Sequence, residues 1–164
     1  MGLGVALLVL GATFAVGTLI GWFVHWIMHQ RWSGRLYRSH MTHHLKLYPP
    51  KDLLSESYRD AGADNGVFIF APPITFACLV LGIVFYVLGL PLWVLALVAV
   101  LSTVIGVVHD SLHTAFHLRN SWLRHFTWFR WLRLMHFVHH RKMNRNLGIF
   151  WFVWDRLFRV FRRP

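Results

Sequence analysis

Cysteine is nearly absent from this sequence. Cys78 is the single cysteine among 164 residues, and it lies inside an apolar stretch. One thiol cannot form a disulfide within the chain, and a zinc site made of thiolates needs several cysteines. Folds that depend on disulfides or on cysteine-bound zinc are therefore excluded, and any metal site must use other side chains.

Acidic residues are scarce as well, and long parts of the chain lack basic residues. The sequence has 6 Asp and Glu against 17 Lys and Arg, which gives a net charge of +11. No Lys or Arg precedes Arg31, and none lies between Arg59 and Arg119. A basic excess can indicate nucleic-acid binding, but these residues flank apolar runs and alternate with Trp and Phe. The pattern favours a membrane interface, and we expect no nucleic-acid partner.

Apolar residues are abundant, since 56% of the chain is hydrophobic and 16% is aromatic. A small soluble domain could not easily keep so much apolar surface out of water. Residues 2–24, 66–88 and 92–112 form largely apolar stretches, each long enough to cross a hydrocarbon core of about 30 Å. We therefore predict one all-α integral membrane domain over residues 1–164, with about three transmembrane helices.

The basic segments between and after these stretches are expected on one side of the membrane. By the positive-inside rule, residues 31–64 and 118–164 face the cytoplasm, which describes a multi-pass protein suited to a bacterial inner membrane. The first stretch is interpreted as a membrane span and not a signal peptide, because no basic residue precedes it and no small-residue cleavage site follows it. Residues 118–164 are expected to form interfacial helices.

Prolines and local patterns add detail to this topology. Pro49 and Pro50 forbid helix continuation, and a short helix is predicted after them, near residues 53–60. Pro72 and Pro73 mark either the start of the second span or a kink in it. The short turn around Gly89 and Pro91 requires the second and third spans to form an antiparallel hairpin.

Histidine is the residue that the sequence has in excess, with 12 copies. Pairs four residues apart point the same way on a helix, and residues at i, i+3 and i+4 share an arc of roughly 100°. Eleven histidines fall into clusters with such spacing: His25 and His29; His40, His43 and His44; His109, His113 and His117; His136, His139 and His140. An odd number of spans brings every cluster to the same cytoplasmic face, so a common site can form there.

The number of imidazoles limits what this site can be. A haem needs only two axial ligands, and a structural zinc is satisfied by four ligands. Ten or so nitrogens divide naturally between two metals with about five ligands each, which leaves positions for water or dioxygen. Imidazole suits iron, zinc, copper and nickel alike, so the spacing predicts a dinuclear site and leaves the metal open.

The order and spacing of these clusters resemble the histidine boxes of the fatty acid hydroxylase and sterol desaturase superfamily. The segment from Asn146 to Gly148, followed by Trp154 to Phe158, is similar to the C-terminal signature of that family, although Arg159 and Val160 replace the usual Gly and Thr. The resemblance runs from about Trp22 to Phe158. It implies a non-haem di-iron monooxygenase, with two iron ions held by histidines, O2 as co-substrate, and zinc as a possible replacement in recombinant protein.

The middle box matches two patterns within this resemblance. In the lipid hydroxylases an Asp stands three residues before the first histidine, which selects Asp110, His113 and His117. In the short carotenoid hydroxylases a His precedes that Asp, which would add His109 as a ligand. Asp110 is then a candidate for fixing a ligand tautomer, with a helix cap or an ion pair as the alternative.

The expected activity is hydroxylation or desaturation of a C–H bond in a membrane lipid. Fatty acyl, sphingoid, sterol and carotenoid substrates all remain open. We expect no fused cytochrome or reductase domain, so the resemblance implies a separate electron donor such as cytochrome b5, a ferredoxin or a reductase. The alternative is a non-catalytic membrane protein that binds metal or haem.

Overall fold

The computed structural model describes residues 2–59 and 69–164, and these residues contain helices and irregular segments but no strand. The α-helices are α1 (Leu3–Met28), α2 (Arg35–Thr42), α3 (Ala71–Val87), α4 (Trp93–His117), α5 (Thr127–Arg141) and α6 (Val153–Leu157). Shorter elements are the 3-10 helices η1 (Arg31–Ser33) and η4 (Trp122–His125) and the π-helix η2 (His43–Leu47). The predicted all-α fold is confirmed for this part of the chain.

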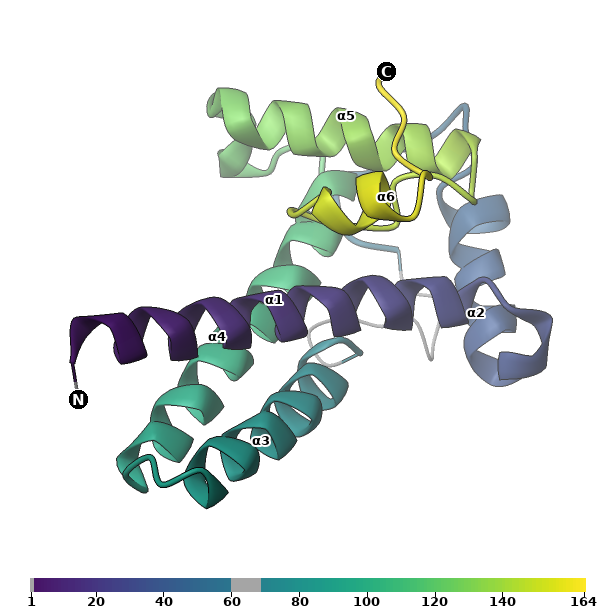
Figure 1. Cartoon of the computed structure of the whole chain (residues 1–164). Helices are drawn as coiled ribbons and strands as arrows, with labels where there is room; N and C mark the ends of the chain where they lie inside the picture. Colours follow the sequence, from purple (N-terminus) through teal and green to yellow (C-terminus); the bar gives the residue numbers. More distant parts are fainter. Residues whose placement is uncertain (1, 60–68) are drawn as a thin grey trace.

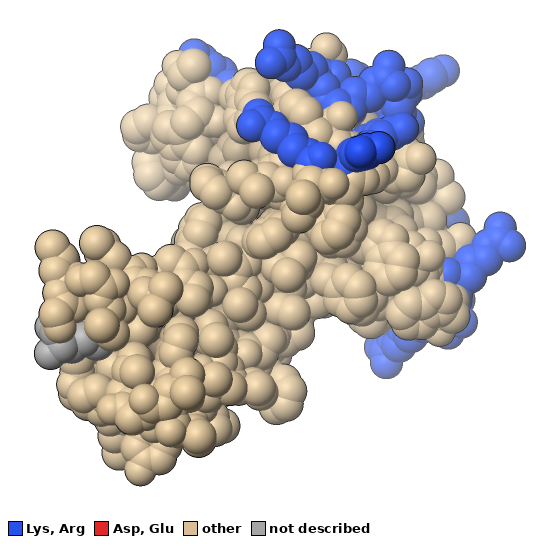
Figure 2. Space-filling view, in the orientation of Figure 1, with Lys and Arg blue, Asp and Glu red and all other residues tan. Residues whose placement is uncertain are grey.

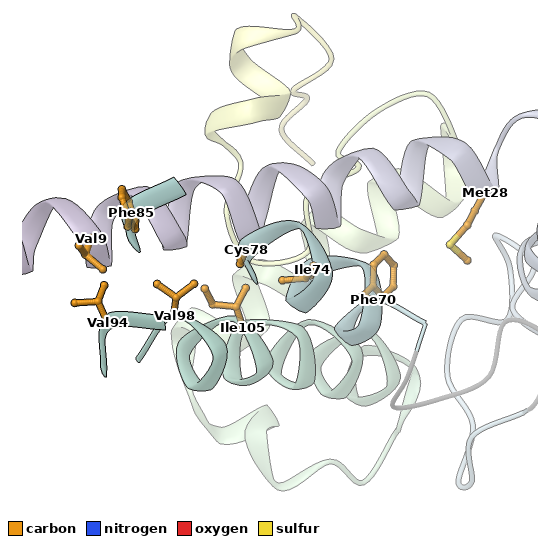
Figure 3. Packing of buried hydrophobic residues seen from close by; sticks show 9 residues of the cluster. All are labelled: Val9, Met28, Phe70, Ile74, Cys78, Phe85, Val94, Val98 and Ile105. Carbon is orange, nitrogen blue, oxygen red and sulfur yellow. The ribbon is translucent and has the colours of Figure 1, made fainter. Parts of the chain in front are cut away.

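Helices α1, α3 and α4 form an apolar unit. Figure 1 shows α3 and α4 as a hairpin that α1 crosses. Figure 3 shows buried side chains from the three helices meeting at their shared faces, among them Val9, Ile74 and Val98. A Cβ atom built on Gly106 would lie only 2.4 Å from the Cα atom of Ala71. The close packing of the two hairpin helices therefore depends on the absence of a side chain at Gly106.

Within residues 2–59 and 69–164, two helices are long and apolar enough to cross a membrane. These are α1, with a mean hydropathy of 2.3, and α4, with a mean hydropathy of 2.0. The second predicted span, residues 66–88, is shorter than expected, because α3 begins at Ala71 and has 17 residues. Pro72 and Pro73 occupy its first turn, where proline is tolerated because the N–H groups there have no partner within the helix. Residues 66–68 lie outside the described part, within which two helices of membrane-spanning length are found where three were predicted.

Charge is distributed unevenly over the molecule. In Figure 2, Lys and Arg gather around α2, α5 and the C-terminal segment, whereas the N-terminal half of α1 and the α3–α4 hairpin show none on this face. Many large apolar side chains of the uncharged half are exposed, including Leu3, Phe76, Val87 and Trp93. This half has the surface expected of a part that contacts lipid.

The second half of the fold lies where α4 ends. Leu112 and Phe116 of α4 pack against Phe129 and Leu132 of α5, and Phe152 completes this cluster. Figure 1 shows α6 beside α5 and α1. The C-terminal segment thereby brings α5 close to the end of α1, and it places the last histidine box next to the first.

The helix predicted near residues 53–60 is absent from its described part. Residues 53–59 are irregular, and Ser55 forms an isolated bridge with Leu118. The backbone N–H of Ser55 donates to the His117 carbonyl, and the Leu53 carbonyl accepts a hydrogen bond from His117 Nδ1. These groups serve the end of α4, so they are not available for the backbone bonds of a helix. Residue 60 lies outside the described part.

Candidate metal centre

Nine buried or half-buried histidines converge in two adjacent groups, each close enough to hold one metal ion. The first histidine group consists of His25, His29, His40, His44 and His139. The second histidine group consists of His43, His117, His136 and His140. Within each group the candidate ligand atoms lie within 4.8 Å of one another. The two groups touch, since the rings of His44 and His140 stack with centroids 4.1 Å apart.

Each three-histidine box is divided between the two groups. In α2 and η2, His40 and His44 join the first group, while His43 joins the second. In α5, His136 and His140 join the second group, while His139 joins the first. On a helix, residue i+4 is rotated by about 40° from residue i in one direction, whereas residue i+3 is rotated from residue i in the opposite direction. One box therefore supplies two ligands to one group and one ligand to its neighbour.

Four nitrogens of the first group form a closed ring. Neighbouring Nε2 atoms in this ring are 3.0–3.2 Å apart, and they belong to His29, His40, His44 and His139. An ion at the centre of a square with such edges would lie about 2.2 Å from each nitrogen, close to a zinc–imidazole bond length. The spacing of these donors therefore fits a metal ion.

Backbone carbonyls fix which nitrogen of several rings faces the site. The Nδ1 atoms of His25, His139 and His140 lie 2.7–2.9 Å from the carbonyl oxygens of Leu147, Arg145 and Tyr48, respectively. His117 Nδ1 lies 3.0 Å from the Leu53 carbonyl. A carbonyl can only accept, so Nδ1 must carry the proton and Nε2 keeps a lone pair directed into the site. This arrangement is typical of metal-binding histidines.

Burial keeps these imidazoles neutral. Burial, together with the nearby His140 ring, lowers the pKa of His29 to about 4. Burial likewise lowers the pKa of His140 to about 3 and holds the pKa of His44 and His139 well below the usual range. Neutral imidazoles have a free lone pair at pH 7, so the donor set is ready to bind a cation without first losing protons.

Two of the buried nitrogens that have no hydrogen-bond partner in the described part of the chain belong to rings whose tautomer is fixed by a backbone carbonyl. They are the Nε2 atoms of His25 and His140, which carry lone pairs because each Nδ1 atom donates elsewhere. A buried polar atom without a partner costs roughly 1–3 kcal/mol. Both atoms belong to the histidine groups, where a bound ion would satisfy them, so the residues present fit two metal ions.

His113 lies between the two groups. Its ring centroid is 4.9 Å from that of His136 and 5.0 Å from that of His43, but 6.1 Å from that of His25. His113 thus lies nearer to the second group, although it is not within the 4.8 Å set. The structure brings ten of the eleven predicted histidines into one continuous cluster around the two groups.

His109 is the predicted ligand that lies apart. Its ring packs on Phe70 with centroids 4.3 Å apart, and a Cβ atom built on Gly21 would lie 2.6 Å from its Cε1 atom. Neither ring nitrogen has a hydrogen-bond partner among the described residues. The side chain fills the space between α1 and the start of α3, one helical turn before His113.

Asp110 has the contacts of a helix cap. Its Oδ1 atom accepts the backbone N–H of Phe70, and its Oδ2 atom accepts that of Ala71, both at 3.3 Å. These N–H groups begin α3 and have no partner within the helix. The structure therefore gives Asp110 the role that the sequence left as the alternative, anchoring the start of α3 against α4.

Asp155 is a buried acidic residue next to the site that the ligand spacing did not reveal. It is fully buried and accepts the N–H groups of Leu147 at 2.6 Å and Gly148 at 3.0 Å, as well as Trp22 Nε1–H at 3.2 Å. The Leu147 carbonyl in turn holds His25 Nδ1. Two signals in the sequence point to it: Asp155 is one of six acidic residues, and it lies within the segment from Trp154 to Phe158 that resembles the C-terminal signature.

A cavity of about 550 Å³ opens beside the first histidine group. It lies between the end of α1, helix α2 and the C-terminal segment, and it is lined by Trp22, Trp26, His29, Gln30, Tyr37, Met41, Met143, Asn144, Leu147, Phe158 and Val160. His29 is the only residue of the two groups that is not fully buried. The cavity therefore gives a small molecule access to the histidine cluster.

Fold and site together define an all-helical protein with two membrane-length helices and a paired polyhistidine centre that suits metal ions. The model of the fatty acid hydroxylase family matches residues 10–160, which is most of the chain. The chain therefore belongs to the fatty acid hydroxylase family, and the resemblance seen in its histidine boxes is confirmed. Neither a curated protein nor a solved structure matches the chain.

Proposed function

We propose that this protein is an O2-dependent di-iron hydroxylase or desaturase that acts on a C–H bond of a membrane lipid. The observation that carries the proposal is the pair of adjacent histidine groups, whose donor spacing fits two metal ions. Membership of the fatty acid hydroxylase family supports hydroxylase or related oxidoreductase activity in general. Two bound irons would supply the activation of dioxygen and the two-electron oxidation of the C–H bond.

His113 is proposed as the fifth ligand of the second histidine group. The first group takes the i, i+4 pair His25 and His29 from α1. The second group takes His117 from α4, and His113 stands one turn before it, as His25 stands before His29. His113 would complete the same composition: one helical pair, two residues of one box and one residue of the other.

Backbone carbonyls of the protein orient the imidazoles, and its apolar side chains exclude water from the site. The carbonyls of Leu53, Arg145, Leu147 and Tyr48 orient four imidazoles, while Trp22 and Trp26 line the approach to His29. Apolar walls hold the reacting carbon of a lipid near the histidine cluster and keep the site dry, which limits side reactions. The lipid would enter from the bilayer at the end of α1.

Electrons would come from a separate protein, for example cytochrome b5, a ferredoxin or a reductase. The Lys and Arg that gather around α2, α5 and the C-terminal segment (Figure 2) suit an acidic donor, because opposite charges speed encounter. The proposal also places α1 and α4 across a membrane, with the histidine cluster on the cytoplasmic side, as in a bacterial inner membrane.

The proposal is tested by lipid analysis of cells that produce the protein under 18O2. Wild-type cells should contain a new lipid species that is heavier by one 18O atom, or lighter by two hydrogens, than its precursor. His139→Ala, which removes one of the four nitrogens in the ring, should abolish this product at equal protein level. The same product in the His139→Ala cells would contradict the proposal.

A further inference from the structure

The cavity beside His29 differs in chemistry from the surface that surrounds it. None of its lining residues is Asp, Glu, Lys or Arg, although the chain has 17 Lys and Arg. Its walls are formed by aromatic rings, including Trp22, Trp26 and Phe158, and by thioether side chains such as Met41. At about 550 Å³ it falls within the range of roughly 300–1,000 Å³ that is typical of small-molecule sites.

The polar groups of the cavity are all neutral. Gln30 and Asn144 offer amides and Tyr37 offers a phenol. Each has a basic residue directly after it in the sequence: Arg31, Arg145 and Arg38. Arg31 and Arg38 are exposed, and Arg145 donates through NH1 to the Arg159 carbonyl at 2.9 Å. None of these three arginines lines the cavity, and neither does Arg159, which lies in the sequence between the lining residues Phe158 and Val160.

An anionic headgroup would find no charged partner in these walls. Carboxylates and phosphates are usually held by Arg or Lys, and an unpaired charge is costly to remove from water. Neutral hydroxyl and amide groups, in contrast, can pair with Gln30, Tyr37 and Asn144. The tryptophans lie at the end of a membrane-length helix, where an amphipathic lipid would arrive from the bilayer interface.

We propose that this cavity binds a lipid whose polar end is uncharged, such as a hydroxyl or an amide, and discriminates against lipids with an anionic headgroup. The inference rests on the proposed function, because it assigns the substrate class of the same site. It separates sterols, carotenoids, long-chain alcohols and amides, which fit, from free fatty acids and acyl thioesters of anionic carriers, which do not.

The test is a binding measurement in nanodiscs of phosphatidylcholine, with tritiated 1-hexadecanol as probe and scintillation proximity as readout. Unlabelled 1-hexadecanol and hexadecyl phosphate, which share one chain and differ in charge, are compared as competitors. We expect hexadecyl phosphate to compete at least about tenfold more weakly, because its charge has no partner in the cavity. Equal or stronger competition by hexadecyl phosphate would overturn the inference.

Two pairs of variants locate the binding. Met41→Trp fills the cavity and should weaken 1-hexadecanol binding by about tenfold or more, whereas Leu134→Trp adds the same bulk on the exposed face of α5 and should leave it unchanged. Asn144→Arg places a cation at the exposed rim and should narrow the difference between the two competitors, whereas Asn144→Gln should not. Unchanged binding in Met41→Trp, or an unchanged difference in Asn144→Arg, would contradict the assignment.

Binding is measured with metal-free and with metal-loaded protein, so that the two proposals can fail separately. Preference for 1-hexadecanol in a protein that binds no metal would support the cavity assignment and contradict the oxygenase. Two metals per chain together with a preference for hexadecyl phosphate would support the oxygenase and contradict the cavity assignment.

Discussion

At the scale of single residues, the structure divides the histidines of each three-histidine box between the two histidine groups. His40 and His44 face one metal position, while His43, between them in sequence, faces the other. The same division occurs at His136, His139 and His140. The spacing predicted that these residues share a site. It could not predict which metal position each one faces, because that depends on how α2 and α5 meet in space.

His113 and His109 provide a paired test of ligand assignment. His113→Ala should reduce the metal content from about two to about one per chain, because it removes the fifth donor of the second group. His109→Leu should leave the metal content at about two, because His109 packs against Gly21 and Phe70 outside both groups. Elemental analysis of the purified variants measures both. A loss of metal in His109→Leu alone would contradict the assignment.

Asp155 is expected to act through other residues. Asp155→Asn replaces one acceptor oxygen by an NH2 group that faces backbone N–H donors, so it should lower the free energy of unfolding by about 1–3 kcal/mol. It should also weaken metal retention, because the Leu147 carbonyl that orients His25 is no longer held. Thermal unfolding with and without a chelator measures both effects.

Asp52→Asn is the matched control for this variant. Asp52 pairs with Arg59 at 2.8 Å on the surface, where its side chain is 53% exposed. Exposed ion pairs contribute little to stability, about 0–1 kcal/mol. If both variants unfolded at the wild-type temperature and kept their metal, the positioning role of Asp155 would be refuted.

At the scale of elements, apolar runs, prolines and turns were enough to predict the main helices. The apolar run before His25 forms α1, and Pro72 and Pro73 lie in the first turn of α3. The third apolar run forms α4, which continues into the middle histidine box. The irregular segment at residues 53–59 could not be predicted in this way. Its backbone forms an isolated bridge with Leu118 and accepts a hydrogen bond from the His117 side chain. Long-range partners of this kind leave no periodic pattern in the sequence.

The contact between α3 and α4 at Gly106 leaves no room for a larger side chain. Gly106→Ala should lower the free energy of unfolding by about 1–3 kcal/mol, because its Cβ atom would overlap Ala71 and push the helices apart. Gly11→Ala in α1 meets no atom within 4 Å and should stabilise the helix slightly. Thermal unfolding in one detergent compares the pair, and equal effects would show that the helices are not tightly packed at Gly106.

At the scale of the whole molecule, the N-terminal half of α1 and the α3–α4 hairpin show no Lys or Arg in Figure 2, whereas these residues gather around α2, α5 and the C-terminal segment. If an acidic protein delivers electrons there, its rate of reducing the metal centre should fall by about tenfold or more between low and high salt. Stopped-flow measurements with a ferredoxin or cytochrome b5 donor provide this rate. A small uncharged reductant is the control, and a salt-independent rate with the protein donor would contradict docking on the basic surface.

The central claim is that the two histidine groups hold two irons, and metal analysis tests it most directly. Protein freed of metal and loaded with Fe²⁺ without oxygen should contain about two irons per chain, in agreement with the two donor sets. Its Mössbauer spectrum after oxidation should show a coupled pair. One iron per chain, or a haem absorption band in the protein as isolated, would contradict the account.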